Sequence, residues 1–359
     1  MERRTVDTYE ARGGDWAARR GRERSEEALA FGASVPTGVV RGDLGAGSGR
    51  HTSDLGAPVV ALDAARTMLD LCRGAGTGAL LVQADLESLP LRRASLGGAW
   101  ASMSYLHVPS RRLPLALADL HRSVAVGGPV VLKLLGGDHE GHDLDGDDIG
   151  GRFFASWEPG PLVDVLVGAG FVVHEVDDQE EGHGRRIVVR AERAPTLADT
   201  VGPGMRLLVC GLNPSLLSAE VGVGFARPGN RFWPAAIAAG AATRERDPLH
   251  ALCNHGTGMT DVVKRATVAA AELVDDEYRT GIARVERLCR WLQPQAICFV
   301  GLSGWRAAVD RKAVAGVQPQ RFGGVPAYVM PSTSGLNAHT KPADHAAHLR
   351  AALALADAA

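Results

Sequence analysis

The sequence contains few of the features that mark membrane, secreted or metal-binding proteins. No stretch reaches the length of about 18 uncharged apolar residues that a membrane-spanning helix requires, and residues 1–7 lack the apolar run of a secretory signal peptide. Only 5 of the 359 residues are cysteines, and no two of them form a C-x-x-C pair. This pattern argues against a disulfide framework and a zinc site. We expect a cytoplasmic protein without a metal or a membrane partner.

Composition and charge indicate a globular protein with one basic half. With 359 residues, 45% of them hydrophobic and 22% charged, the chain is longer than one ordinary domain and has ample core material. Residues 201–359 carry 17 Lys and Arg against 12 Asp and Glu, which leaves 22 basic and 29 acidic residues in the first 200. The positive half favours a polyanionic partner such as nucleic acid.

Two series of apolar segments predict two α/β domains. In each series, short apolar runs typical of buried strands alternate with stretches of helical length, which indicates parallel β-α units. Residues 195–204 carry two prolines and two glycines without periodicity, so we expect a linker there between domains at 1–194 and 205–359. The expected strands are 39–44, 59–62, 80–84, 98–103, 130–134, 170–173 and 186–189 in the first domain and 207–210, 296–300 and 325–330 in the second.

Two loops of the second domain follow predicted strands, at the sheet edge where open α/β sheets place their sites. They are residues 211–215 and 331–337, and an aromatic and arginine-containing segment, 224–233, lies between them. An enzyme that swings a base out of duplex DNA needs such groups: an aromatic face, amides that read the base, basic groups for phosphates and an apolar wedge.

The residue types suggest a role for several positions. The Asn213 amide would orient a water, Phe225 would stack on the base, and Leu336 beside Gly335 would fill the vacated space in the duplex.

Arg227 and Arg231 would meet phosphates. Each position also has a plainer interpretation, because asparagine before proline is usually a turn former, aromatic side chains usually belong to the core, and surface arginines usually form a solvated face.

Four ordered motifs resemble those of the mismatch-specific uracil/thymine DNA glycosylases. They are GLNPS at 211–215, SAEVGVGFARPGNRFW at 218–233, GTGMTDVV at 256–263 and YVMPSTS at 328–334. The resemblance implies an α/β/α sandwich that acts in base excision DNA repair, without a cofactor, on uracil or a related damaged base in mispaired double-stranded DNA. Because neither active loop contains a lysine that could form a Schiff base, we expect monofunctional hydrolysis.

The resemblance also implies roles for individual residues. Asn213 would position the water, Phe225 would stack on the flipped base, and Ser218 would lie near the uracil 5-position and disfavour thymine. The loop 335–338 would penetrate the duplex. The implied base pocket comprises Gly211, Leu212, Ser218, Phe225, Asp261 and Ser334, and the implied DNA contacts are Arg227, Asn230, Arg231, Gly335, Leu336, Asn337 and His339.

Two positions depart from the family. Asp261 stands where relatives tend to carry Lys or Asn, and a carboxylate there disfavours acceptor-rich base edges. Ala338 stands where bacterial relatives often carry an Arg. This difference weakens the prediction that the loop recognises the guanine opposite the target base. An alternative is therefore a lesion-binding module with little turnover, in which Asp261 has impaired the pocket.

The first domain carries a D-x-G-x-G-x-G turn after its first predicted strand, and glycines there let the backbone approach a ligand closely. Acidic residues also end the next two strands. Together these features resemble the class I S-adenosylmethionine-dependent methyltransferases over residues 9–177, with a dinucleotide oxidoreductase as the rival. The resemblance implies that S-adenosylmethionine (SAM) is bound by Asp43, Gly45, Gly47, Gly49, Asp63, Asp85 and Leu86.

The sequence does not identify the methyl acceptor. The motifs of DNA amino-methylation and cytosine C5-methylation are missing, and Tyr105 and His107 are expected to be structural. The acidic stretch 139–148 lacks the Gly and Glu positions of a calcium loop and is expected to be a solvated loop. We therefore predict a monomeric fusion of a methyltransferase and a glycosylase. The alternative is primarily a methyltransferase whose second domain binds nucleic acid without efficient excision.

Overall fold

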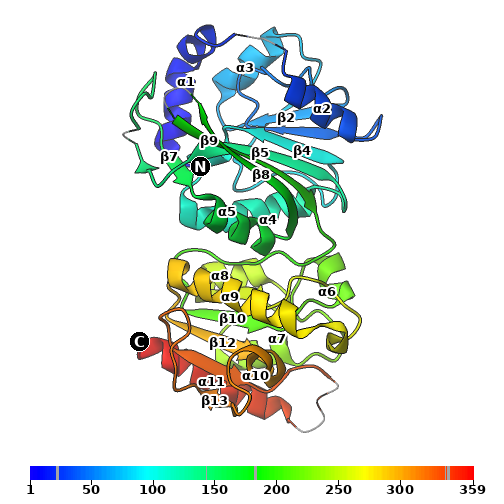
Figure 1. The fold of residues 1–359 in the computed structure, drawn as a ribbon, viewed down its shortest axis with the longest axis vertical. Coiled ribbons are helices and arrows are strands. Elements are labelled where there is room, and N and C mark those ends of the chain that lie inside the picture. Colours follow the sequence, from blue (N-terminus) through cyan, green and yellow to red (C-terminus); the bar gives the residue numbers. More distant parts are fainter. Residues whose placement is uncertain (22–23, 143, 182–183, 336, 338–339) are drawn as a thin grey trace. The chain divides into compact units, whose positions relative to one another are not determined.

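The chain folds as two α/β units, each with its own sheet (Figure 1). The computed structural model describes residues 1–21, 24–142, 144–181, 184–335, 337 and 340–359. The first unit comprises Met1–Val167 and Phe171–Ala194, and the second comprises Gly168–Gly170 and Pro195–Ala359. The expected class, two α/β domains, is confirmed. In the described part of the chain, no helix has both the length and the apolar character needed to cross a bilayer.

The first unit is built on a nine-stranded sheet with the order β3-β2-β1-β4-β5-β9-β8, to which β7 and β6 are added beside β5. The first five strands are parallel, whereas β9 runs antiparallel to β5 and β8. The strand order reverses between β1 and β4, and ligand sites of open α/β sheets form at such a reversal. The strands are Arg41–Leu44 (β1), Val59–Asp63 (β2), Leu80–Gln83 (β3), Gly98–Ser102 (β4), Pro129–Gly136 (β5), Glu140–Gly141 (β6), Phe154–Trp157 (β7), Phe171–Glu181 (β8) and Gly184–Arg193 (β9).

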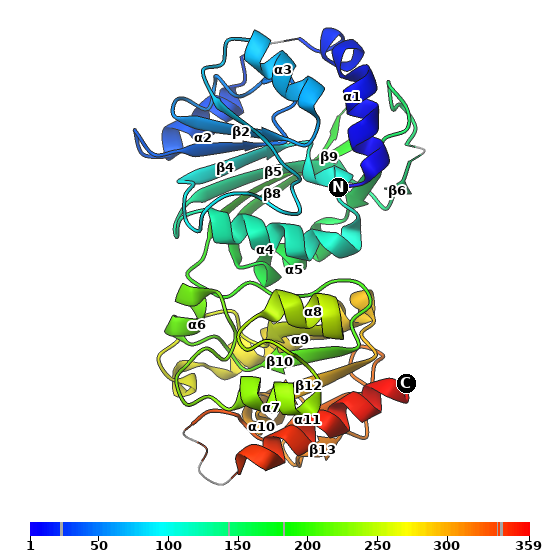
Figure 2. The ribbon, with the colours of Figure 1, turned by 180° about the vertical axis from the view of Figure 1, so that it is seen from behind.

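Helices cover both faces of this sheet. Figures 1 and 2 show α4 and α5 on one face and α1, α2 and α3 on the other. The tilted contact between Phe31 of α2 and Trp100 of β4 belongs to the core of the second of these faces. The helices are Arg3–Ala18 (α1), Glu26–Ser34 (α2), Arg66–Gly74 (α3), Leu113–Ser123 (α4) and Pro159–Gly168 (α5).

The second unit has a five-stranded sheet with the order β11-β10-β12-β14-β13, in which only β13 is antiparallel to its neighbour. Its strands are Leu207–Gly211 (β10), Thr257–Asp261 (β11), Ala296–Val300 (β12), Gly316–Val317 (β13) and Ala327–Met330 (β14). Its helices are Leu216–Val221 (α6), Phe232–Ala239 (α7), Pro248–His255 (α8), Asp275–Leu292 (α9), Leu302–Ala308 (α10) and Pro342–Asp357 (α11).

Alternate residues of these strands face two helical layers, as successive side chains of a strand must. Val209 belongs to the same buried cluster as Phe232 of α7 and Leu349 of α11. Phe299 of β12 lies on the opposite face of the sheet and contacts Trp305 of α10 edge to face. The predicted α/β/α sandwich is therefore confirmed.

The segment expected as a linker, 195–204, is packed into the second unit. Thr200 pairs with Met259 through two backbone hydrogen bonds of 2.8 Å. The carboxylate of Asp199 is 3% exposed and accepts hydrogen bonds of 2.8 Å from both Lys264 and Arg284. A buried carboxylate needs such partners, so this segment is part of the fold and does not act as a free connection.

Candidate active sites

In the second unit, both predicted loops leave the same edge of the sheet. Strands β10 and β14 are each parallel to β12, which lies between them, so residues 211–215 and 331–335 follow at the carboxyl edge. The segment around Arg231 contacts the second loop, because its backbone N–H donates to Thr333 O at 2.9 Å. A Cβ on Gly335 would lie only 3.0 Å from Gly229 O, so the loop needs glycine to approach this segment.

The amide of Asn213 is held in one orientation. Its Nδ2 donates to Thr267 Oγ1 at 2.8 Å and to Arg265 O at 3.0 Å, with a longer contact to Pro214 O at 3.3 Å. The hydrogen-bond network thus assigns the nitrogen to this side, and Oδ1 is presented as an acceptor. Sequence reasoning missed Thr267, which is 54 residues from Asn213.

Phe225 adopts a backbone conformation that bulky residues rarely take, with a φ of 57°. Such conformations cost energy and persist only where the surroundings hold them. Here the ring stacks on Phe232, with centroids 4.1 Å apart, and Trp233 Nε1 donates to Gly224 O at 2.9 Å. A cavity beside Phe225 has a volume of ≈10 Å³, which is room for about one water.

Asp261 ends strand β11 with a buried carboxyl group, 8% exposed. A side chain at Gly211 would collide with Asp261 Oδ1, and the same Cβ position lies 3.5 Å from Phe225 Cζ. The carboxyl group and the ring therefore meet at the bare backbone of Gly211. Burial raises the pKa of Asp261 to about 6, against the opposing charges of Lys264 and Arg284. Among the described residues, none donates a hydrogen bond to this carboxyl group.

Three residues expected at the base or the DNA make hydrogen bonds within the protein. Ser218 Oγ accepts from Ser215 Oγ at 3.1 Å and from Ala226 N at 3.4 Å. Asn230 Oδ1 accepts from Phe232 N at 2.9 Å. Arg231 Nη1 donates to the carbonyl groups of Asn337 and Thr340 at 3.1 and 2.6 Å. These bonds shape the loops, which gives the three side chains structural roles at the site.

The other expected residues are placed around these loops. Arg227 is exposed and makes one long contact, 3.5 Å, with Val268 O. Leu212, Ser334 and Asn337 are half-buried, and Asn337 Nδ2 donates to Ser332 O at 2.8 Å. The predicted wedge Leu336, together with Ala338 and His339, lies outside the described residues.

In the first unit, a pocket of ≈390 Å³ opens at the carboxyl ends of β1, β2 and β4. Gly45 and Gly47 line it with positive φ values of 72° and 55°. A side chain on Gly45 would collide with Ser104. Gly47 N donates to Asp63 Oδ2 at 2.9 Å, which ties the glycine turn to the end of β2. The bare turn leaves the backbone open to a ligand.

Two carboxyl groups line the pocket, that of Asp43, which is buried, and that of Asp63, which is half-buried. Burial raises the pKa of Asp43 to about 7, although Thr52 donates to it at 2.6 Å. Burial also raises the pKa of Asp63 to about 6, against hydrogen bonds from the backbone of Ala65 and Gly47. Both groups fit a ligand with positive charge and hydroxyl groups, because either would favour the ionised carboxylate. SAM has a sulfonium group, an ammonium group and a ribose, so the residues present fit it.

Other expected cofactor residues are not among the residues that line this pocket, although Met1, which Asp85 binds, is. Asp85 accepts hydrogen bonds of 2.9 and 2.8 Å from the ammonium group of Met1, and Leu86 is buried in the core. Neither lines the pocket, and Gly49 does not line it either. A Cβ on Gly49 would lie 2.7 Å from Cys72 Sγ, so this glycine allows close packing of the turn against α3.

Helix α1 contributes pocket residues that the sequence did not suggest. Tyr9 and Trp16 line the pocket, together with His107. His107 Nδ1 lies 2.6 Å from Phe153 O and must donate to it, so Nε2 accepts from the Tyr9 hydroxyl at 3.0 Å. Burial lowers the pKa of His107 to about 4, and Arg152 acts in the same direction. His107 is thus a neutral pocket residue, whereas Tyr105 is buried outside the pocket.

These arrangements define two candidate sites: a pocket at the strand reversal of a Rossmann-like sheet, and a cluster of loops at the carboxyl edge of a smaller sandwich. Residues 198–355 match the family model of the Uracil DNA glycosylase superfamily, and residues 42–132 match that of the Methyltransferase domain. The chain therefore combines a segment similar to the Uracil DNA glycosylase superfamily with a segment similar to the Methyltransferase domain.

Solved methyltransferase structures are similar to part of the chain. One is a SAM-dependent methyltransferase from Methanosarcina mazei, with 19% identity, 43% of this chain and 92% of that chain covered, and a TM-score of 0.38. Another, from Mesorhizobium loti, has 20% identity, coverage of 48% and 100%, and a TM-score of 0.39. The 1,6-didemethyltoxoflavin-N1-methyltransferase of Burkholderia thailandensis has 20% identity, coverage of 52% and 85%, and a TM-score of 0.42.

Proposed function

We propose that the second unit is a monofunctional DNA glycosylase of the mismatch-specific branch, which removes uracil or a related deaminated base from mispaired duplex DNA. The observation that carries the proposal is the fixed amide of Asn213. Three acceptors hold its nitrogen, and the acceptor oxygen is therefore oriented before any water arrives. A pre-oriented acceptor favours one attack geometry without a reorganisation cost in the reaction.

The proposed reaction needs no cofactor. The target base leaves the duplex and stacks on Phe225, which must open the small cavity beside it. Asn213 Oδ1 accepts a hydrogen bond from a water directed at C1′ of the sugar. The C1′–N bond breaks with its electron pair going to the base, the water oxygen bonds to C1′, and a proton is released. Arg227, which is exposed, contacts a phosphate of the bound duplex.

A second candidate for this unit is lesion binding with little turnover. Two observations favour it: Asp261 brings a buried carboxyl group to the ring of Phe225, and the cavity between them has room for about one water. An ionised carboxylate accepts hydrogen bonds only, so it repels the carbonyl oxygens of a uracil edge.

For the first unit we propose SAM-dependent methylation. Asp63 would accept hydrogen bonds from the ribose, Asp43 would face the positive charge of the cofactor, and the turn at Gly45 and Gly47 would allow its close approach. When bound, the cofactor supplies an electrophilic methyl group. The neutral ring of His107 and the hydroxyl of Tyr9 line the space in which an acceptor would meet it.

Excision assays with the full chain test the glycosylase proposal. Duplexes that contain G·U, G·T, A·U or a deaminated purine serve as substrates, and Asn213→Ala should lower the excision rate at least about 100-fold with little change in the Kd for DNA. Asn254→Ala removes a matched, exposed asparagine from α8 and should excise at the parental rate.

Excision by Asn213→Ala at the parental rate would show that the assigned role is wrong. Tight binding of a lesion by the parental chain, without abasic-site formation on any duplex, would favour the lesion-binding module instead.

A further inference from the structure

Helix α1 presents one face to the pocket of the first unit. Val6, Tyr9 and Trp16 of this helix line the pocket, and their spacing along the chain places them on one side of a helix. Arg20 continues the same side just after the helix ends at Ala18, and it also lines the pocket. The match to the methyltransferase family model begins only at residue 42. This wall of the pocket therefore lies outside the matched segment.

The indole ring of Trp16 lies beside the glycine turn. A Cβ on Gly47 would lie 3.7 Å from two atoms of that ring, Cη2 and Cζ3, which is the distance of ordinary contact. Tyr9 packs against Trp16 edge to face, with ring centroids 5.8 Å apart. An aromatic wall therefore adjoins the backbone turn that a ligand of this pocket approaches.

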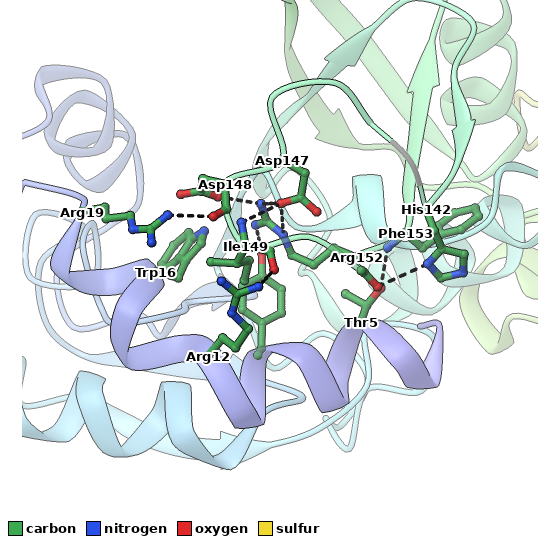
Figure 3. A network of polar contacts seen from close by, with 12 residues as sticks. Thr5, Arg12, Trp16, Arg19, His142, Asp147, Asp148, Ile149, Arg152 and Phe153 are labelled. Atoms are coloured by element: carbon green, nitrogen blue, oxygen red, sulfur yellow. Dashed lines mark hydrogen bonds and ion pairs between the residues drawn. The ribbon is translucent and has the colours of Figure 1, made fainter.

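Polar contacts hold α1 to the segment 147–153 (Figure 3). Phe153 N donates to Thr5 Oγ1 at 2.8 Å, and Arg152 Nη1 donates to the Tyr9 hydroxyl at 2.8 Å. Figure 3 also shows other arginines of α1 and its C-terminal end that reach backbone carbonyl groups of the same segment. These bonds hold the aromatic wall in place beside the pocket.

The guanidinium group of Arg20 is oriented, but only one of its nitrogens is used within the protein. It lies over the ring of Trp16, 4.1 Å from the ring centroid. Its Nη1 donates to Asp148 Oδ2 at 2.7 Å and to Trp16 O at 3.2 Å. Among the described residues, none accepts a hydrogen bond from Nε or Nη2. The side chain keeps 31% of its surface exposed, and neither of these nitrogens is a buried atom.

Two further arginines line the pocket, and both are less suited to a ligand. Arg152 uses all three of its guanidinium nitrogens on two aspartates and a tyrosine hydroxyl. Arg50 is exposed, and no described residue accepts a hydrogen bond from it. A side chain without partners loses more conformational freedom on binding than one that is already held. Arg20 combines a held position with unused donors.

The unused donors of Arg20 match one group of SAM. Nε and Nη2 form one edge of the guanidinium plane, and arginine binds carboxylates through two parallel hydrogen bonds of this kind. Asp43 and Asp63 supply acceptors for the positive charge and the hydroxyl groups of the cofactor, but they repel its carboxylate. The carboxylate of the amino-acid part therefore needs a cation, and Arg20 is the one placed for it.

We propose that Arg20, stacked on Trp16 beside the glycine turn, binds the carboxylate of the amino-acid part of SAM, so that α1 and its C-terminal end belong to the cofactor site. The inference rests on the methyltransferase function proposed above and deepens it.

The test compares two ligands that differ only in this carboxylate. Isothermal titration calorimetry measures the binding of SAM and of decarboxylated SAM to the full chain. The parental chain should bind SAM at least about tenfold more tightly, because a hydrogen-bonded ion pair is absent from the complex with decarboxylated SAM.

Arg20→Gln should remove most of this preference by weakening the binding of SAM, with little change in the affinity for decarboxylated SAM. The second ligand thus reports whether the variant is folded. Arg19→Gln is the matched control, because Arg19 is exposed, does not line the pocket and donates to the backbone oxygen of Asp148 at 2.7 Å. This control should keep the parental preference.

Equal binding of the two ligands by the parental chain would overturn the inference. Equal weakening of both ligands in Arg20→Gln would also overturn it, since the residue would then only support the pocket. A preference that is lost in Arg50→Gln and kept in Arg20→Gln would place the carboxylate on the other arginine. If the parental chain bound neither ligand, the proposed methyltransferase function itself would be wrong, and the two failures are thus distinguishable.

Discussion

At the scale of single residues, Asp63 connects the glycine turn to the cofactor pocket. Its Oδ2 accepts from Gly47 N and its Oδ1 from Ala65 N, each at 2.9 Å. We predict that Asp63→Ala lowers the affinity for S-adenosylhomocysteine at least about tenfold, because a charged acceptor for the ribose and the support of the turn are lost together. Isothermal titration calorimetry measures the effect.

Asp85→Ala is the control for that prediction. Asp85 binds the Met1 ammonium group and does not line the pocket, so its variant should keep the parental affinity. A comparable loss in both variants would mean that Asp85 reaches the cofactor after all.

The raised pKa of Asp43 predicts pH-dependent cofactor binding. With a pKa of about 7, its carboxyl group is protonated in the free protein below that pH. The positive charge of bound SAM favours the carboxylate, so binding releases a proton. The affinity should therefore rise as the pH increases towards about 7, by at most about tenfold per pH unit, and level off above it. The pKa of Asp63, about 6, adds to the slope at lower pH.

Calorimetry across this pH range, in buffers with different ionisation enthalpies, measures both the affinity and the released proton. Asp43→Asn cannot ionise and should flatten the upper part of the profile. An unchanged profile in this variant would assign the proton to another group.

At the scale of elements, helix α9 is held to the segment 195–204 by a buried ion pair and to β11 by a hydrogen bond. Arg284 donates to Asp199 Oδ2 at 2.8 Å and to Asp261 O at 2.9 Å, and its side chain is 5% exposed. We predict that Arg284→Leu lowers the free energy of unfolding of the second unit by about 3 kcal/mol, because it leaves Asp199 buried with Lys264 as its remaining cation. Urea unfolding measures the loss.

Arg279→Leu, on the same helix, is the matched control. Its pair with Asp276 has side chains 61% and 85% exposed, and exposed pairs contribute little. The control should stay close to the parental stability. A similar loss in both variants would point to a general effect on α9.

At the scale of the whole molecule, each unit has its own sheet and core. A ligand that binds only the folded form of one unit stabilises that unit alone. We predict two thermal transitions, of which S-adenosylhomocysteine raises only one. Differential scanning calorimetry with and without the ligand tests this, and Asp63→Ala should remove the shift. A shift of both transitions would mean that the units unfold together.

The elements that sequence reasoning predicted well were those whose burial leaves a local pattern. The apolar runs at 59–62 and 296–300 correspond closely to β2 and β12, because a strand covered on both faces must be apolar along its length. Helix α1 was not predicted, since its sequence is highly charged and contains two glycines. Strand β11, TGMTD, was missed because it has almost no apolar run.

The two α/β domains, the glycine turn and the loop motifs were readable from the order of residues alone, because periodicity, turn chemistry and motif spacing are local properties. Which side chains meet was decided only by the tertiary structure. Thr267 reaches Asn213, and Tyr9 and Asp147 enter the cofactor pocket from distant segments. Asp85 is not in the lining of that pocket and instead binds the ammonium group of Met1, which is. Contacts of this kind depend on how strands and helices pack in space. The spacing of residues along the chain does not show which distant side chains that packing brings together.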